Sequence, residues 1–521
     1  MDEIVGAGNI IVRMPVRWKI NWPLPIALLA ILARVLPTPR TIDDAFITFR
    51  YARNLLAGSG FVFNVGQHVL GTTTPLYTLL LAGLAGVLRY GNYPWLALLV
   101  NTLADAGTCL LLIPFGTILT GQRRVGVAAA LLWAIAPMSV TFAIGGMETS
   151  VFILLLVVTG YLYLLGRTRL AALTSGLLLL ARPDGALLVG PLAIDLLVQS
   201  WRARRFPAAE IGILLATLLP WIVFATLYFG SPIPHSIAAK SVAYRLPPDA
   251  ALVRLVQQYG TPFFEQDLLG RFWPLAGFIL YLTLTLLGSL RSVRANRRAW
   301  PIALFPWLYF VAYSVANPLI FRWYLAPPLP FYILLILAGL DRLLSDLLAA
   351  IRGWRWNLPF SPLAIPVGAF VFLSLHAWTL HPDHGPTEPA PQMAFHQLEL
   401  YYADIGRSLA PQVTPNTVLA AGDVGALGYY SNARIIDTVG IVSPEATAYY
   451  PLDPALYVIN YAIPPKLILD TRPDYVILME VYGRAGLLLD PRFQASYTLV
   501  RQIDTNIYGS RGLLVYQRRG P

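Results

Sequence analysis

Residues 211–228 read IGILLATLLPWIVFATLY, a run of 18 residues without a charged side chain. About 20 such residues in an α-helix span the hydrocarbon core of a bilayer, so this run predicts a transmembrane helix. Runs with one charge or none recur along the chain, and one soluble core could not bury them all. Examples are 22–36, 95–119, 125–144 and 149–165.

The composition of the whole chain also indicates a membrane protein. Of its 521 residues, 56% are hydrophobic and only 12% are charged, and the mean hydropathy is +0.60. In a typical soluble domain, about a quarter of the residues are charged. We therefore expect an α-helical polytopic membrane protein. Its twelve apolar segments are 21–37, 74–88, 94–118, 125–143, 150–166, 170–181, 184–199, 208–229, 272–288, 301–316, 323–340 and 358–379.

The net charge of +11 indicates topology rather than nucleic-acid binding. The arginines form short clusters between apolar runs, as in the cytoplasmic loops of membrane proteins. Placing these clusters inside gives a consistent alternation from residue 123 onward and puts everything after residue 380 outside. We expect a multi-pass protein of the plasma (inner) membrane with a membrane module at 1–380. The clusters are Arg123–Arg124, Arg167–Arg169, Arg202–Arg205, Arg291–Arg298 and Arg352–Arg355.

The first part of the chain does not fit a simple alternation. Basic residues within 13–19 precede the first apolar segment without a convincing cleavage site, so the N-terminus is expected inside. Two full spans at 74–88 and 94–118 would then leave Arg123 outside the cytoplasm. One of these two segments is therefore expected to be partial or re-entrant, which gives about eleven crossings. The sequence leaves open which one.

Three stretches are too polar for the bilayer. Residues 38–72 form a loop with an amphipathic helix predicted over Asp43–Leu56, and 231–270 are expected to lie as a lid along the membrane interface. After a linker at His381–Gln392, residues 385–521 have the composition of a small extracytoplasmic α/β domain. Its strands are predicted at Thr417–Ala421, Tyr475–Leu478, Tyr497–Gln502 and Leu513–Gln517.

Two adjacent acids, Asp43 and Asp44, lie at the start of the amphipathic helix. Acids at a helix N-terminus accept backbone N–H bonds and suit the helix dipole, so capping is the plain explanation. Capping explains one acid better than two, because adjacent like charges raise each other's pKa. Arg50 and Arg53 follow on one helical face and could partly neutralise the pair.

The segment 43–66, DDAFITFRYARNLLAGSGFVFNVG, resembles the first extracytoplasmic loop of a group of bacterial GT-C glycosyltransferases. The group includes the mycobacterial terminal arabinofuranosyltransferases that use decaprenyl-phosphate arabinose. Two departures concern Thr72–Thr74 and Trp323, where relatives often have Tyr-Thr-Asn and Tyr. Trp323 adjoins the supposed lipid-phosphate site, so the identity of the donor is not carried over. Further matches are Gly146–Thr149, Arg182–Gly185, Tyr228–His235, Ala239-Lys240, Arg322–Pro327, Gly422–Tyr430 and Ile436–Glu445.

The resemblance implies an inverting transfer of one sugar from a polyprenyl-phosphate donor to a hydroxyl outside the cytoplasm. The acceptor would be a glycan, a lipid or a protein. The resemblance further implies that Asp43 is the general base and that Asp44 orients Asp43 or the sugar. A positioned base contributes about 10²–10⁴ to the rate, and cations must stabilise the phosphate that leaves.

Charged residues near the outer ends of apolar segments are the other candidates for binding the donor. Glu148 and Arg182 are expected to face a cavity. The alternative for Glu148 is interfacial solvation, and for Arg182 a structural ion pair with Asp184 is an equal alternative. Lys240 and Arg322 are expected to converge on one lipid-facing cavity and meet the phosphate. The alternative for both is snorkelling at the interface.

Arg50 and His235 complete the candidate set for substrate binding, although a lone histidine in a Pro-rich turn is more often solvated. The six histidines show no spacing typical of a metal site. No cofactor is predicted, and the resemblance leaves open whether a divalent cation takes part. The stretch from Gly422 to Gly425 lacks the glycine spacing of a nucleotide site, and Asp423 is a candidate for sugar binding.

Two other functions remain open at this point. A transporter or flippase for lipid-linked glycans would also need a polytopic bundle, but it would not need the acid pair or a sizeable C-terminal domain. The absence of an internal repeat also weighs against it. The third function is that of an inactive scaffold that binds glycan lipids.

Overall fold

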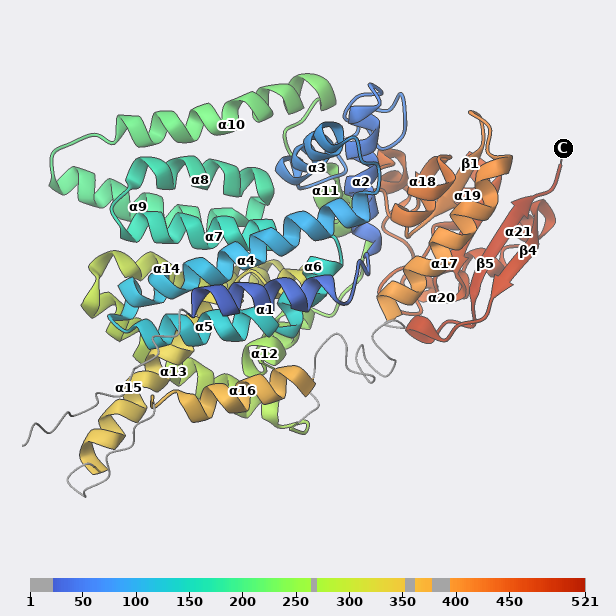
Figure 1. Cartoon of the computed structure of the whole chain (residues 1–521). Helices are drawn as coiled ribbons and strands as arrows, with labels where there is room; N and C mark the ends of the chain where they lie inside the picture. Colours follow the sequence, from blue (N-terminus) through green and yellow to red (C-terminus); the bar gives the residue numbers. More distant parts are fainter. Residues whose placement is uncertain (1–21, 264–268, 352–360, 377–393, 521) are drawn as a thin grey trace, which may run out of the picture.

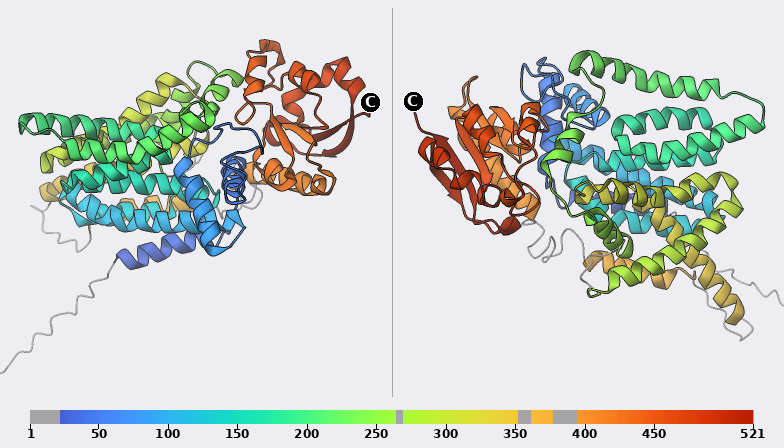
Figure 2. Two further views of the ribbon diagram at one scale, coloured as in Figure 1. Left: turned by 90° about the horizontal axis from the view of Figure 1, so that it is seen from above. Right: turned by 180° about the vertical axis from the view of Figure 1, so that it is seen from behind.

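The computed structural model describes residues 22–263, 269–351, 361–376 and 394–520 of the chain. A bundle of helices is followed by an α/β part at one of its ends (Figures 1 and 2). The predicted linker His381–Gln392 and the basic N-terminal stretch lie outside the described residues.

The apolar runs form helices whose ends lie close to the expected positions. In the bundle these helices pack side by side, and short polar helices lie between them. The helices of this part are α1 (Pro23–Val35), α2 (Asp43–Leu56), α3 (Pro75–Leu88), α4 (Tyr93–Thr120), α5 (Arg123–Ile135), α6 (Pro137–Ile144), α7 (Thr149–Leu164), α8 (Thr168–Ala181), α9 (Ala186–Arg202), α10 (Ala208–Phe229), α11 (His235–Ala243), α12 (Ala250–Gly260), α13 (Trp273–Ala295), α14 (Trp300–Ala316), α15 (Leu329–Ile351) and α16 (Ala364–His376).

Four helical segments of the described chain are long and apolar enough to cross a bilayer, and the pair α5 and α6, bent by 47°, would make a fifth. The four are α4, α10, α13 and Arg297–Ala316, which contains α14. Shorter apolar helices include α3, whose 14 residues measure about 21 Å. Since α4 has 28 residues, α3 is the shorter of the two segments considered for a partial span. The figure of about eleven crossings stays a prediction.

A buried arginine stabilises the bend between α5 and α6. Pro137 begins α6 and has no backbone N–H to donate to a carbonyl of α5, so the hydrogen-bond ladder of α5 is interrupted there. The guanidinium of Arg34 donates to the carbonyl of Ala134 at 2.8 Å and to Oγ of Ser139 at 2.6 Å. Its Nε lies 2.6 Å from Oδ2 of Asp105, and both side chains are buried. The hydrogen bond from Arg34 therefore supplies a donor to the carbonyl of Ala134 at the bend.

Three of the arginine clusters, at 123–124, 202–205 and 291–298, lie at the end of the bundle away from the α/β part, and the cluster Arg352–Arg355 lies outside the described residues. Figure 1 shows the turn between α9 and α10 at that end. Arg202 of this turn and Arg294 of α13 line one cavity there. At the same end Asp341 of α15 is buried and binds Arg124 at 2.6 Å and Arg291 at 2.8 Å. The tertiary fold therefore brings separate basic loops together.

The expected lid, 231–270, divides into two helices with different surroundings. Helix α11 lies beside the α/β part, where Gly440 approaches Ala239. Helix α12 packs within the bundle, and the hydroxyl of its Tyr259 donates to the carbonyl of Pro306 at 2.5 Å. Residues 264–268 lie outside the described residues.

The α/β part contains a five-stranded sheet in the order β2-β1-β3-β5-β4. Strands β2, β1 and β3 are parallel, with Ala420 opposite Ile436 and Val476, whereas β5 and β4 run antiparallel. Four strands coincide with the runs singled out in the sequence; the short β2 does not. The elements are α17 (Ala394–Leu409), β1 (Val418–Ala421), α18 (Gly425–Ser431), β2 (Arg434–Asp437), α19 (Pro465–Thr471), β3 (Tyr475–Met479), α20 (Glu480–Gly483), α21 (Pro491–Ser496), β4 (Tyr497–Ile503) and β5 (Leu513–Arg518).

The separation of the basic loops from the α/β part generates a topology prediction. Cysteines introduced by Ser59→Cys and Ser408→Cys, both at exposed positions, should react with a membrane-impermeant maleimide in intact cells. A cysteine introduced by Ala203→Cys, exposed in the basic turn, should react only after permeabilisation. The native Cys109 is buried and should contribute no background. Labelling of only one of the first two positions would contradict the topology.

Candidate active site

A cavity of about 820 Å³ lies where the bundle meets the α/β part. Its wall is built by the first turns of α2, the loop 71–74, the turn 182–187, helix α11 and the segment 312–319. The α/β part contributes Ile441. A cavity of this size matches the pockets that hold drug-sized ligands.

Asp44 and Lys240 form an ion pair in this cavity. Nζ of Lys240 lies 3.3 Å from Oδ2 of Asp44, and the two side chains keep 23% and 29% of their exposure. Nζ also lies 4.8 Å from the ring centroid of Phe321. Burial disfavours the ammonium, but the charge of Asp44 outweighs this effect and raises the pKa of Lys240 above its ordinary value. The pair thus brings a carboxylate and a firmly charged cation into one partly open space.

Asp43, the first acid of the pair, binds the α/β part instead. Its two carboxylate oxygens accept hydrogen bonds from the amides of Gly425 at 2.8 Å and Ala426 at 2.9 Å, in the first turn of α18. It is absent from the residues that line the cavity. Burial, and after it the charge of Asp423, raise the pKa of the Asp43 carboxyl, and the two amide bonds oppose the shift.

Arg50 and Arg53 also hold the α/β part rather than the cavity. Nη2 of Arg50, which is buried, donates to the carbonyl of Ala433 at 2.7 Å. Arg53 donates to the carbonyl of Tyr429 at 2.8 Å and to Oδ1 of Asn432 at 2.6 Å. One face of α2 is therefore an interdomain contact. Arg50, a candidate for substrate binding in the sequence, lies in that contact.

A second part of the α/β fold shapes the cavity wall. The carboxylate of Asp437, at the end of β2, accepts hydrogen bonds from the amides of Val439 at 2.8 Å and Val442 at 3.0 Å. These bonds order the loop that presents Ile441 to the cavity. Gly71 faces the same loop so closely that a Cβ there would lie 2.9 Å from the carbonyl oxygen of Ile441.

Arg182 is held between two acids on the far wall of the cavity. It makes bidentate bonds to Asp184 at 3.0 and 2.9 Å, and its Nη1 lies 3.2 Å from Oε1 of Glu148. The hydroxyl of Tyr313 donates to Asp184 at 3.1 Å, and the hydroxyl of Tyr309, which donates to the carbonyl of Tyr324 at 2.7 Å, lies 3.3 Å from the same carboxylate. Glu148 and Arg182 thus line the cavity as expected, and the anticipated ion pair with Asp184 is also present.

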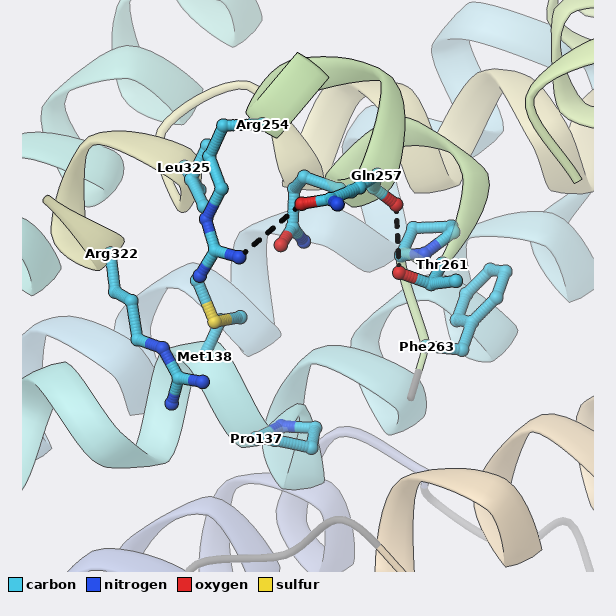
Figure 3. A pocket seen from close by; sticks show the side chains of 10 residues that line it. Pro137, Met138, Arg254, Gln257, Thr261, Phe263, Arg322 and Leu325 are labelled. Carbon is cyan, nitrogen blue, oxygen red and sulfur yellow. Dashed lines mark hydrogen bonds between the residues drawn. The ribbon is translucent and has the colours of Figure 1, made fainter. Parts of the chain in front are cut away.

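Arg322 lines a different, smaller cavity. This space of about 40 Å³ is bounded by Arg254, Gln257 and Arg322 among others, and Figure 3 shows how their side chains lie along it. Arg322 is absent from the lining of the large cavity. The expectation that Lys240 and Arg322 meet in one cavity is therefore wrong. Residues 322–325 form a tight 3₁₀ turn whose Trp323 and Tyr324, but not Arg322, line the large cavity.

His235 begins α11, where its backbone N–H donates to the carbonyl of Leu70 at 2.8 Å. Burial lowers the pKa of its imidazole, and the residue does not line the cavity.

Glu399 of α17 was not singled out in the sequence. Its carboxyl is buried with no hydrogen-bond partner in the described chain. Burial, and then the charge of Asp43, raise the pKa of Glu399 well above its ordinary value.

No motif could have revealed Glu399, because it comes near Asp43 only in the folded chain. Asp423, a candidate for sugar binding, is partly buried and lies close enough to Asp43 to raise its pKa. Within the described ranges, no group of three or more His, Cys, Asp or Glu could hold a metal ion.

The chain resembles known glycosyltransferases in sequence. It is 30% identical over 222 residues to the terminal β-(1→2)-arabinofuranosyltransferase of Mycobacterium tuberculosis. It is 31% identical over 235 residues to the protein of the same name from Corynebacterium glutamicum. The matches cover 39% of this chain and only 35% and 33% of those relatives, so the chain matches about a third of their length. Residues 391–516 match a domain of unknown function, DUF8728.

The fold resembles that of ArnT from Cupriavidus metallidurans. The structure of ArnT bound to undecaprenyl phosphate aligns with a TM-score of 0.56 and covers 96% of this chain and 99% of that chain, at 15% identity. The apo structure gives a TM-score of 0.57 at the same identity. The chain therefore has an ArnT-like GT-C fold. Together, the two comparisons confirm the resemblance to bacterial GT-C transferases.

The bond between Asp43 and α18 generates a prediction about docking of the α/β part. A Cβ on Gly425 would lie 1.9 Å from the backbone oxygen of Asp43. Gly425→Ala should therefore separate the two segments, at a cost of about 1–3 kcal/mol. We expect a lower melting temperature and faster amide hydrogen exchange in residues 425–433.

Gly190→Ala is the matched control, since it also places a methyl group on a helix but meets open space. It should neither lower the melting temperature nor speed amide exchange in residues 425–433. Wild-type exchange in Gly425→Ala would show that the close approach is not required for docking.

Proposed function

We propose that this chain is a membrane glycosyltransferase that transfers one sugar, with inversion, from a polyprenyl-phosphate donor to a hydroxyl group. The acceptor is a glycan, a glycolipid or a protein outside the cytoplasm. The observation that carries the proposal is the pairing of Asp44 with Lys240 in a large cavity of an ArnT-like fold. The similarity to terminal arabinofuranosyltransferases supports transfer of a pentofuranose, although the match covers about a third of those proteins.

The reaction needs a proton acceptor and a cation in one space. The acceptor hydroxyl attacks the anomeric carbon and loses its proton to a carboxylate. The bond from that carbon to the phosphate oxygen breaks, and polyprenyl phosphate leaves with the electron pair. Attack opposite the leaving group inverts the anomeric centre. Stabilising the leaving phosphate with a preorganised cation is the largest contribution that the protein can make.

Within this proposal, Asp44 is the base and Asp43 is a positioning residue, the reverse of the roles that the family resemblance implies. Both oxygens of Asp43 accept amide hydrogen bonds, which stabilise the ionised form in place. Asp44 lines the cavity, and its single described bond leaves Oδ1 free to take a proton. In this proposal Asp44 takes part in the reaction, and Asp43 holds the α/β part in place.

Lys240 is the proposed ligand of the donor phosphate. The guanidinium of Arg182 is already bound by two carboxylates, so it is less available to an incoming anion. A phosphate that binds Lys240 would displace Asp44 from it. Donor binding would then release the base at the moment when an acceptor can use it.

The orientation of the chain and its location in the inner membrane are also proposals. The basic loops lie at the end of the bundle opposite the α/β part, which supports a cytoplasmic position for these loops in the inner membrane. The cavity and the α/β part would then face the extracytoplasmic side. A flippase for lipid-linked glycans, the alternative from another class, would not need a base in this cavity.

Asp44→Asn should lower sugar transfer by at least about 10², because the amide keeps the shape of the side chain but does not accept the proton. Asp43→Asn should have a smaller effect, accompanied by weaker docking of the α/β part, since an amide NH₂ cannot accept from both Gly425 and Ala426. The measurement is transfer from synthetic polyprenyl-phosphate sugars by the purified protein. Full activity of the Asp44→Asn protein would refute its role as base. Lipid movement across vesicles without transfer by the wild type would favour the flippase.

The competition for Lys240 generates a separate prediction for binding. Asp44→Asn removes the carboxylate that competes with phosphate for Lys240, so undecaprenyl phosphate should bind at least about threefold more tightly. Lys240→Met should weaken binding, and Asp346→Asn, which neutralises an exposed acid outside the cavity, is the control that should leave it unchanged. Binding can be measured by titration of the purified protein in detergent. Equal affinities for wild type and Asp44→Asn would refute the exchange of Lys240 from Asp44 to the phosphate. They would not contradict the transfer reaction itself.

A further inference from the structure

The basic end of the bundle contains two adjoining cavities that the proposed reaction does not use. One, of about 660 Å³, is lined by Arg202 of α9, by Arg294 of α13 and by Arg297 in the turn before α14. The other, of about 730 Å³, is lined by Arg202, Arg204 and Arg205. Arg202 belongs to both. Loops that are about 90 residues apart in the sequence thus form one continuous basic surface.

These five arginines differ from the arginines inside the bundle. Arg34, Arg124, Arg182 and Arg291 each bind a carboxylate. In the described part of the chain, no ion pair involves the five arginines of the two cavities. Arg205 lies near the carboxylate of Glu210, and the positive charge of the other four is available to an anion.

The acid that lines the first cavity is engaged by other donors. Asp195 lines the first cavity, but its carboxylate accepts hydrogen bonds from Nε1 of Trp300 at 2.9 Å and from Nε2 of Gln199 at 2.6 Å. It also accepts a hydrogen bond from the hydroxyl of Tyr163. These neutral donors satisfy the carboxylate without consuming an arginine. The cavity wall keeps a net positive charge.

Large apolar side chains flank the arginines. Trp201 and Phe206, next to Arg202 and Arg205, are 81% and 74% exposed. Ile194 on α9 is 57% exposed. Aromatic rings of this kind lie at the level of lipid headgroups, and exposed aliphatic side chains contact acyl chains. The surface therefore suits a ligand with both a phosphate and apolar chains, and it suits a free phosphate poorly.

We propose that the two cavities bind the headgroup of an anionic phospholipid from the adjoining leaflet, with its phosphate among Arg202, Arg204, Arg205, Arg294 and Arg297. The acyl chains lie along the exposed side chains of α9 and beside Trp201 and Phe206. The shared arginine allows a headgroup with two phosphates to occupy both cavities. Basic pockets between transmembrane helices bind such headgroups in membrane proteins. The site is independent of the proposed transfer reaction.

Native mass spectrometry of the delipidated full-length protein tests this site. We expect phosphatidylglycerol and cardiolipin to bind at least about tenfold more tightly than phosphatidylcholine, since each arginine near a lipid surface strengthens attraction several-fold. Arg294→Gln/Arg297→Gln and, separately, Arg204→Gln/Arg205→Gln should each reduce this preference by at least about threefold. Each double variant keeps other basic residues in its loop, so the orientation in the membrane should be retained, as labelling of Ser59→Cys can verify.

Arg342→Gln is the matched control, because it removes one exposed arginine that is paired with Asp346 and lies outside both cavities. It should leave the preference unchanged. Replacing the arginines of the two double variants by lysine should preserve most of the preference for anionic lipids, because the positive charge remains. These arginines are Arg204, Arg205, Arg294 and Arg297. Equal affinity for anionic and zwitterionic lipids, or an unchanged preference in both double variants, would overturn the proposal. Displacement of the bound lipid by millimolar inorganic phosphate would also overturn it, since the site would then recognise phosphate without its chains.

Discussion

A charge inside a helix bundle that lies in lipid is stable only beside a partner, because neither acyl chains nor packed apolar side chains solvate it. Three groups of described charges within the bundle obey this constraint, and each group joins segments that are far apart in the sequence. The pairs therefore cross-link helices as well as neutralising charge. They are Arg34 with Asp105, Asp341 with Arg124 and Arg291, and Arg182 with Glu148 and Asp184.

The same constraint distinguishes the ion pair in the large cavity. Asp44 and Lys240 keep part of their exposure, so a competing anion can separate them at a lower cost than it could separate a fully buried pair. The more deeply buried pairs cross-link the bundle, whereas we propose that this pair exchanges partners when the donor phosphate binds. In a reaction that expels a phosphate and removes a proton, the cation must bind the phosphate while the base accepts the proton. The ion pair between them must therefore be able to separate.

The α/β part belongs to the site because of how it is attached. Asp43, Arg50 and Arg53 of α2 all bind backbone groups of residues 425–433. The adjoining loop contributes Ile441 to the cavity wall. The region matched by the domain of unknown function therefore closes a cavity whose charged residues come from the bundle.

The sequence by itself determined the class of the protein, the positions of the helices and the location of the acid pair at the start of α2. A membrane span takes about 20 consecutive residues and a helix cap about one turn, so contiguous stretches of the sequence are enough to reveal them. Only the tertiary structure decided which acid faces the cavity. Adjacent residues on a helix point about 100° apart, and the amides that bind Asp43 lie 382 and 383 residues further along the chain. The separation of Arg322 from Lys240 was likewise decided by packing, since the direction of a side chain depends on contacts between segments that no local pattern records.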